Sequence, residues 1–197
     1  MAMSNFVITI GREFGSNGKK IGEEVAKRLG IKCYDKELLS LAAKDSGFCE
    51  EILESNDEKP TRSFLYSLVM DTYSMNHYST APFLDMPLNQ KVFLAQYEAI
   101  QKIAGRESCV IVGRCADHIL KEYMPFRIFV YADMESKIKR CREKGPEDEK
   151  LSDKELRQKI SGIDKKRSKY YEFYTGHSWG DKLNFDLCIN TTQTVIK

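Results

Sequence analysis

The residues best suited to chemistry lie near the start of the chain, in the stretch GREFGSNGKK at positions 11–20. Glycines let a backbone curl until successive N–H groups point at one anion, and a lysine adds a point charge for the outer phosphates. We therefore predict a phosphate-binding loop, whose members are Gly15, Ser16, Asn17, Gly18, Lys19 and Lys20. Lys19 is the first candidate for a catalytic role, because phosphoryl transfer needs positive groups beside the transferred phosphate.

The stretch departs at two positions from the common phosphate-loop pattern G-x-x-x-x-G-K-[ST]. Glu13 stands where the first glycine is expected, and Lys20 replaces the hydroxyl residue that would hold magnesium. We therefore assign no residue as a metal ligand. If Mg²⁺ takes part, we expect other carboxylates to hold it through water, or the protein to bind it weakly.

The elements around the loop have the order that a phosphate site needs. Phe6–Ile10 is a β-branched apolar run typical of a buried strand, and Lys19–Leu29 has apolar residues at helical spacing, with Gly30 as a stop signal. The loop therefore joins a strand to the N-terminus of a helix, where the helix dipole favours an anion.

Further strands and helices alternate along the chain. Strands are predicted at 109–112, 128–131 and 185–189, and helices at 88–104, 134–144 and 152–174, the last with a Ser152-x-x-Glu155 capping box. This alternation predicts the α/β class, with a parallel sheet covered by helices on both faces and ligands at the carboxyl ends of the strands. A length of 197 residues suits one domain, residues 1–197.

Residues 45–87 interrupt this alternation with three prolines and a segment rich in Tyr, Met and Ser. Long irregular segments in compact domains are usually functional or mobile. We expect either an inserted, partly helical lobe or lid, or a surface for homodimerisation.

Composition excludes several other classes of protein. The 31 basic and 29 acidic residues nearly balance, so no strong field draws the protein to nucleic acid, and no apolar run approaches a membrane span. The six cysteines form no CxxC pair, and we expect reduced thiols in core segments. These features predict a soluble cytoplasmic protein with a small-molecule partner.

Taken with its position, the GREFGS stretch resembles the opening of the cytidylate kinase-like branch of the P-loop kinases. Val110–Arg114 resembles the family's strand followed by Gly-Arg, and Asp164-x-x-Arg167 resembles an Asp-x-x-Arg of its lid. The resemblance implies a three-layer P-loop kinase fold, ATP and Mg²⁺ as cofactors, and a lid region at about 137–175.

Site residues follow from the same resemblance. It implies that Arg114 contacts the acceptor's phosphate, that Arg167 closes over the phosphates during transfer, and that Asp164 belongs to the acceptor side. Asp35 has two interpretations: a helix N-cap, or a carboxylate that orients the attacking oxygen or holds water on magnesium. Arg140 and Arg142 are expected on a solvated helix face, with lid arginines as the alternative.

The predicted function is transfer of a phosphoryl group from ATP to a small acceptor, with a nucleoside monophosphate as the main candidate. Cys115 stands where cytidylate kinases have an Asp that recognises the nucleotide, which puts a preference for cytidine in doubt. The alternative is a nucleotide-binding or regulatory module that keeps the fold without catalysing transfer.

Overall fold

The computed structural model describes residues 5–46, 50–58, 87–143, 148 and 150–193. The strands are β1 (Val7–Arg12), β2 (Lys32–Tyr34), β3 (Cys109–Val112), β4 (Phe126–Tyr131) and β5 (Leu187–Asn190). The helices are α1 (Gly18–Leu29), α2 (Glu37–Ser46), α3 (Glu50–Asn56), α6 (Leu88–Arg106), α7 (Ala116–Ile119), α8 (Met134–Arg142) and α10 (Asp153–Thr175), with short 3₁₀ turns at Lys121–Tyr123 and Lys182–Asn184.

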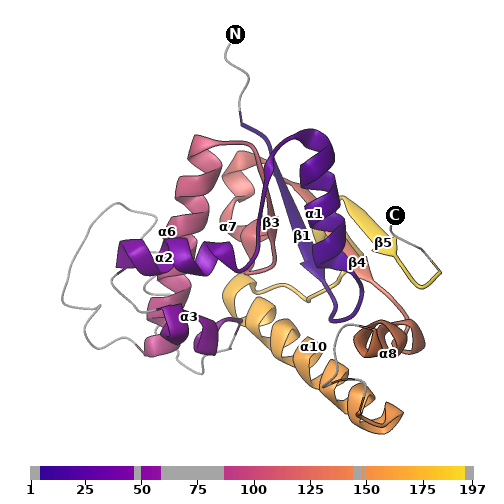
Figure 1. Ribbon diagram of the computed structural model, residues 1–197. Coiled ribbons are helices and arrows are strands. Elements are labelled where there is room, and N and C mark those ends of the chain that lie inside the picture. Colours follow the sequence, from indigo (N-terminus) through magenta and orange to yellow (C-terminus); the bar gives the residue numbers. More distant parts are fainter. Residues whose placement is uncertain (1–4, 47–49, 59–86, 144–147, 149, 194–197) are drawn as a thin grey trace.

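The five strands form one parallel sheet in the order β2-β3-β1-β4-β5 (Figure 1). From β1 the chain crosses over α1 to the edge strand β2, whereas β4 and β5 lie on the opposite side of β1. The direction of winding therefore reverses around β1, and ligands of open α/β sheets bind outside the carboxyl ends of the strands at such a reversal.

Alternating side chains of the central strands divide the core into two halves. Ile8 and Ile10 of β1 face α1, together with Val110 and Val112 of β3. Val7, Cys109 and Ile111 face the other way, toward α6, α7 and the end of α10. The two halves and the sheet give three layers, so the predicted α/β fold with helices on both faces is confirmed.

The predicted boundaries are close to the observed ones, with one difference that affects the site. β1 continues to Arg12 because Gly11 and Arg12 pair with Phe129 and Val130 of β4. Arg12 therefore leaves the sheet from a strand rather than from a loop. The capping box of α10 is present, with Ser152 and Glu155 bonded to each other's backbone amides.

The cysteines follow the prediction in part. Cys109, Cys115 and Cys141 are buried and Cys33 is half-buried, but Cys188 is exposed because β5 is an edge strand. The expectation of a core position is wrong for Cys188, and Cys49 lies outside the described residues.

Two regional predictions stay open. Of residues 45–87, the structure describes 45–46, 50–58 and 87, so the choice between a lobe or lid and a dimer surface mostly concerns residues outside the described part. The lid proposed at 137–175 corresponds to α8 and α10, and its movement stays a prediction. No helix among the described residues is long and apolar enough to cross a membrane.

Candidate active site

The loop between β1 and α1 is curled by its own backbone. Gly15 and Asn17 adopt the left-handed region, with φ of 79° and 65°. Ser16 closes the turn, because its hydroxyl donates to the Glu13 carbonyl at 2.8 Å and accepts from the Gly18 amide at 3.3 Å. The Ser16 side chain is therefore occupied within the loop.

The outward face of the loop carries unused N–H groups. The Ser16 carbonyl accepts a hydrogen bond from Thr191 Oγ1 at 2.8 Å, and because a peptide unit is planar and trans, the Asn17 amide points the opposite way. Within the described part of the chain, the amides of Gly15, Asn17 and Lys19 donate no hydrogen bond to another protein group. These groups and the first turn of α1 form an electropositive concavity.

A buried lysine supports the loop from beneath. Lys137 of α8 is only 6% exposed, and its Nζ lies 2.6 Å from Glu13 Oε2 and 3.1 Å from Asp164 Oδ2. The other Asp164 oxygen accepts from the Phe14 amide at 2.7 Å. Both Asp164 oxygens thus hold the loop in place, and its predicted role toward the acceptor stays a prediction that these contacts do not favour.

Arg140 also supports the loop. Its guanidinium donates to the Gly15 carbonyl at 3.3 Å and to both the hydroxyl and the carbonyl of Thr191. The expectation of a solvated helix face is therefore wrong for Arg140. Arg142 agrees better with the expected solvated helix face, since its guanidinium pairs with the exposed Asp153.

We predict that Gly18→Ala will disrupt the loop. An added Cβ would lie 2.4 Å from the Arg12 Cβ, so β1 and α1 would have to move apart. We expect a loss of about 1–3 kcal/mol of stability and weaker nucleotide binding, measured by urea unfolding and calorimetry. The matched control is Gly162→Ala in α10, where an added Cβ meets nothing within 4 Å and should stabilise the helix by roughly 0.5–1 kcal/mol. Equal behaviour of the two variants would contradict the close packing at Gly18.

A cavity of about 480 Å³ opens above the loop. Loop residues line it together with Lys20, Glu23, Asp35 and Arg167.

Lys19 Nζ lies 2.9 Å from Asp35 Oδ2 and 3.7 Å from Glu23 Oε1. The hydrogen bond to Asp35 raises the pKa of Lys19. Burial alone would raise the pKa of Asp35, but the bond from Lys19 and the charge of Arg114 outweigh it and lower this pKa.

Asp35 is placed by β2, which ends one residue before it, whereas α2 begins only at Glu37. Its carboxylate contacts Lys19 and, at 3.6 Å, Arg114 Nη1. These contacts favour the predicted site carboxylate over the N-cap interpretation.

Arg114 follows β3 and is 1% exposed. Its Nε and Nη2 donate to the two Asp57 oxygens at 3.0 and 2.8 Å, and its Nη1 donates to the Asp35 carbonyl at 2.7 Å. All three nitrogens thus already have protein acceptors. A contact between Arg114 and the acceptor's phosphate stays a prediction, and it would require the release of Asp57.

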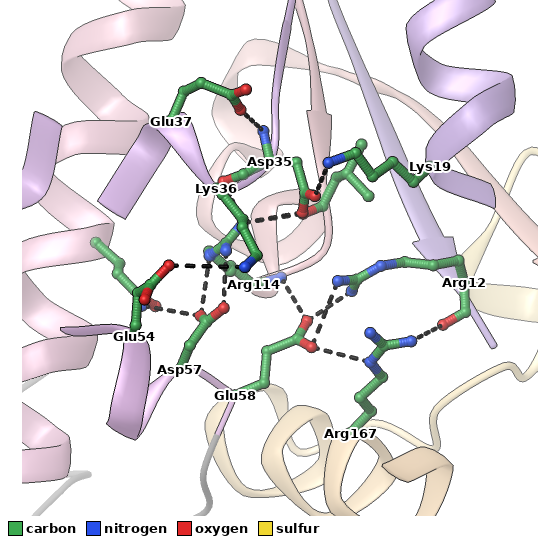
Figure 2. A network of polar contacts seen from close by, with 12 residues as sticks. Arg12, Lys19, Asp35, Lys36, Glu37, Glu54, Asp57, Glu58, Arg114 and Arg167 are labelled. Carbon is green, nitrogen blue, oxygen red and sulfur yellow. Dashed lines mark hydrogen bonds and ion pairs between the residues drawn. The ribbon is translucent and has the colours of Figure 1, made fainter. Parts of the chain in front are cut away.

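Beside Arg114, two further arginines share one carboxylate (Figure 2). Glu58 Oε1 lies 2.6 Å from Arg12 Nη1, and Glu58 Oε2 accepts from Arg167 Nε at 3.0 Å. Arg167 also donates to the Arg12 carbonyl at 3.3 Å, which fixes α10 against the end of β1. The predicted residues Lys19, Asp35, Arg114 and Arg167 are therefore brought to one edge of the sheet.

Sequence reasoning missed Arg12, Asp57, Glu58 and Lys137. Arg12 belongs to the GREFGSNGKK stretch, but the sequence analysis assigns it no role. Its place directly after an apolar strand is a signal that could have identified it. Lys137 lies three residues after Met134 and four before Cys141, on the apolar stripe of its helix. Glu58 lies in an irregular segment whose pattern gave no signal.

The sequence matches the model of the cytidylate kinase-like family over residues 7–193. The chain belongs to this family. The predicted resemblance to this family is thereby confirmed over most of the chain. Membership and fold support a nucleotide-binding, kinase-like protein.

Two solved structures are similar. An uncharacterized protein from Eubacterium ventriosum has 28% sequence identity and a TM-score of 0.68, over 96% of this chain and 90% of that one. Shikimate kinase from Bacteroides thetaiotaomicron has 14% identity and a TM-score of 0.52, over 94% of this chain and 86% of the other, which supports the kinase fold alone. No curated protein matches the sequence significantly.

Proposed function

We propose that the protein transfers the terminal phosphoryl group of ATP to a small acceptor, with a nucleoside monophosphate as the first candidate. The observation that carries this proposal is the concavity between β1 and α1, where unused loop amides, a helix N-terminus and Lys19 face a cavity large enough for a polyphosphate. We propose the cytoplasm as its location, where ATP occurs together with reduced thiols.

Each charged side chain of the cavity has a proposed task. Lys19 would leave Asp35 and bind the outer phosphates, because a phosphate offers it more charge than one carboxylate does. Arg167 would stabilise the charge that spreads over the transferred group. Asp35, once released from Lys19, would orient the attacking oxygen of the acceptor.

Magnesium fits the site as a partner of the phosphates. The described residues contain no group of three or more His, Cys, Asp or Glu side chains that could hold a metal ion. Mg²⁺ needs only one or two carboxylates when phosphates and water complete its shell, and Asp35 and Glu23 both line the cavity. The ion would supply charge neutralisation at the phosphates, and these two carboxylates would hold its water.

The residue at position 115 gives no support for a cytidine preference. Cys115 is 3% exposed and its backbone is left-handed, with φ of 55°, so its thiol lies within the core behind the site. We therefore leave the base of the acceptor open.

Incubation of the purified protein with ATP, Mg²⁺ and a panel of nucleoside monophosphates and small metabolites tests the proposal. We expect ADP formation that depends on one class of acceptor, with a phosphorylated product identified by mass spectrometry. ATP binding measured by calorimetry without transfer to any acceptor would instead favour the nucleotide-binding regulatory module.

A further inference from the structure

Glu58 is an internal counter-ion between two arginines. Arg12 contacts both of its oxygens, at 2.6 and 3.4 Å, and Arg167 donates to Oε2 at 3.0 Å. The Arg114 amide adds a longer contact to Oε1 at 3.4 Å. Its carboxylate, 13% exposed, thus accepts several charge-assisted hydrogen bonds on both oxygens. A bound oxyanion would be held by the same kind of contacts.

Glu58 keeps this place with a strained backbone. Its φ is 49°, in the left-handed region that non-glycine residues rarely adopt. Apolar packing anchors the segment one turn earlier, at Leu53 of α3, which is fully buried. The Glu58 carboxylate accepts hydrogen bonds from Arg12, Arg167 and the Arg114 amide, and these contacts hold the strained residue in place.

Arg12 and Arg167 need a negative group between them, but this group need not be the Glu58 carboxylate. Burial lowers the pKa of Arg167, and the neighbouring charge of Arg12 lowers it further. Burial would raise the pKa of Glu58, but the charges of Arg12 and Arg167 outweigh it and hold this pKa low. Two partly buried cations side by side are stable only with a negative group between them, and any oxyanion of similar size meets that need.

The position of Glu58 links it to the site. Arg12 and Arg167 both line the cavity that holds Lys19, and Figure 2 shows Glu58 pointing between them, on the side of Arg114. Asp35, which we propose orients the acceptor, lines the same cavity, so an acceptor bound there would lie close to Arg12 and Arg167.

We propose that Glu58 is a displaceable internal ligand of an oxyanion site made by Arg12 and Arg167, and that an oxyanion group of the acceptor replaces its carboxylate there. The identity of the ligand as the acceptor rests on the proposed function, whereas the exchange of Glu58 for an oxyanion does not. The competing interpretation is a fixed glutamate that only positions the arginines.

Binding of inorganic sulfate, measured by calorimetry, tests the exchange without any turnover. All variants carry Lys19→Ala, so that any sulfate held by the loop amides is held equally in each variant and cancels in the comparison. We expect Glu58→Gln to bind sulfate at least about tenfold more tightly, because the internal competitor no longer occupies the site. Glu54→Gln is the matched control: it removes the same charge from the same segment, but its partner is the exposed Lys36 at 3.7 Å, and its affinity for sulfate should not change.

Two further variants complete the test. One shows whether Arg167 binds the sulfate, and the other replaces Glu58→Gln if that variant does not fold. Adding Arg167→Met to Glu58→Gln should abolish the gain, and a gain that persists would overturn the proposal. If Glu58→Gln does not fold, Glu58→Asp keeps the charge but shortens the reach, and it should tighten sulfate binding to a smaller extent. Sulfate affinity equal to or weaker than that of the parent, in whichever of these two variants folds, would also overturn it and leave Glu58 as a fixed positioning residue. The result can be read whether or not the protein proves to be a kinase.

Discussion

Replacing Lys19 by alanine is expected to lower the rate of phosphoryl transfer by about 10²- to 10³-fold, the range found when one group that stabilises transition-state charge is removed. Lys19 lines the cavity with its Nζ 2.9 Å from Asp35 Oδ2, and the change would remove the point charge that we propose binds the outer phosphates. The measurement is kcat with ATP, Mg²⁺ and the acceptor found in the panel.

The fold should tolerate this change, because the Lys19 side chain is 49% exposed and belongs to no core cluster. Lys27→Ala is the matched control: it removes the same charge from the last turn of the same helix, away from the cavity, and should leave kcat within twofold or so of the parent. Unchanged turnover in Lys19→Ala, with Lys27→Ala equally active, would reject the catalytic role of Lys19.

The phosphate loop could be predicted because its signals are local. Strand, loop and helix follow one another within Val7–Leu29, and each is marked by residue types that act over a few positions. The place of Arg114 at the carboxyl edge of the sheet could also be predicted, because it follows the strand expected at 109–112 and the carboxyl ends of parallel strands share one edge.

The ionic contacts around the loop could not be predicted in the same way. Glu58 is 46 residues from Arg12 and 109 from Arg167, and no periodic pattern links them. Charged residues are usually solvated, so Arg140 was expected in water, although α8 packs across the loop and brings its guanidinium to Gly15. Sequence patterns show which faces are buried, but not which buried charges meet.

The contacts of Glu13 explain how the phosphate loop accommodates a large charged side chain at the position of the motif's first glycine. In the common pattern a glycine stands at the position of Glu13, and here the side chain at this position is turned beneath the loop, where Lys137 and the Ala132 amide bind it. The departure at Glu13 is therefore compensated by Lys137 on α8, and these two residues belong to one structural unit.

Lys137→Met is accordingly expected to lower the free energy of unfolding by about 3 kcal/mol, measured by urea denaturation at neutral pH. Removing one partner of a buried ion pair leaves uncompensated charge, here on both Glu13 and Asp164, at a typical cost of about 3–5 kcal/mol. We expect the low end because the Glu13 side chain keeps some exposure to water. Lys139→Met, an exposed lysine of the same helix, should stay within roughly 0.5 kcal/mol of the parent.

The comparison with Lys139→Met separates the loss of the buried ion pairs from a general effect of removing a lysine from α8. A free energy of unfolding for Lys137→Met within roughly 0.5 kcal/mol of the parent would mean that the contacts of Lys137 with Glu13 and Asp164 do not stabilise the loop.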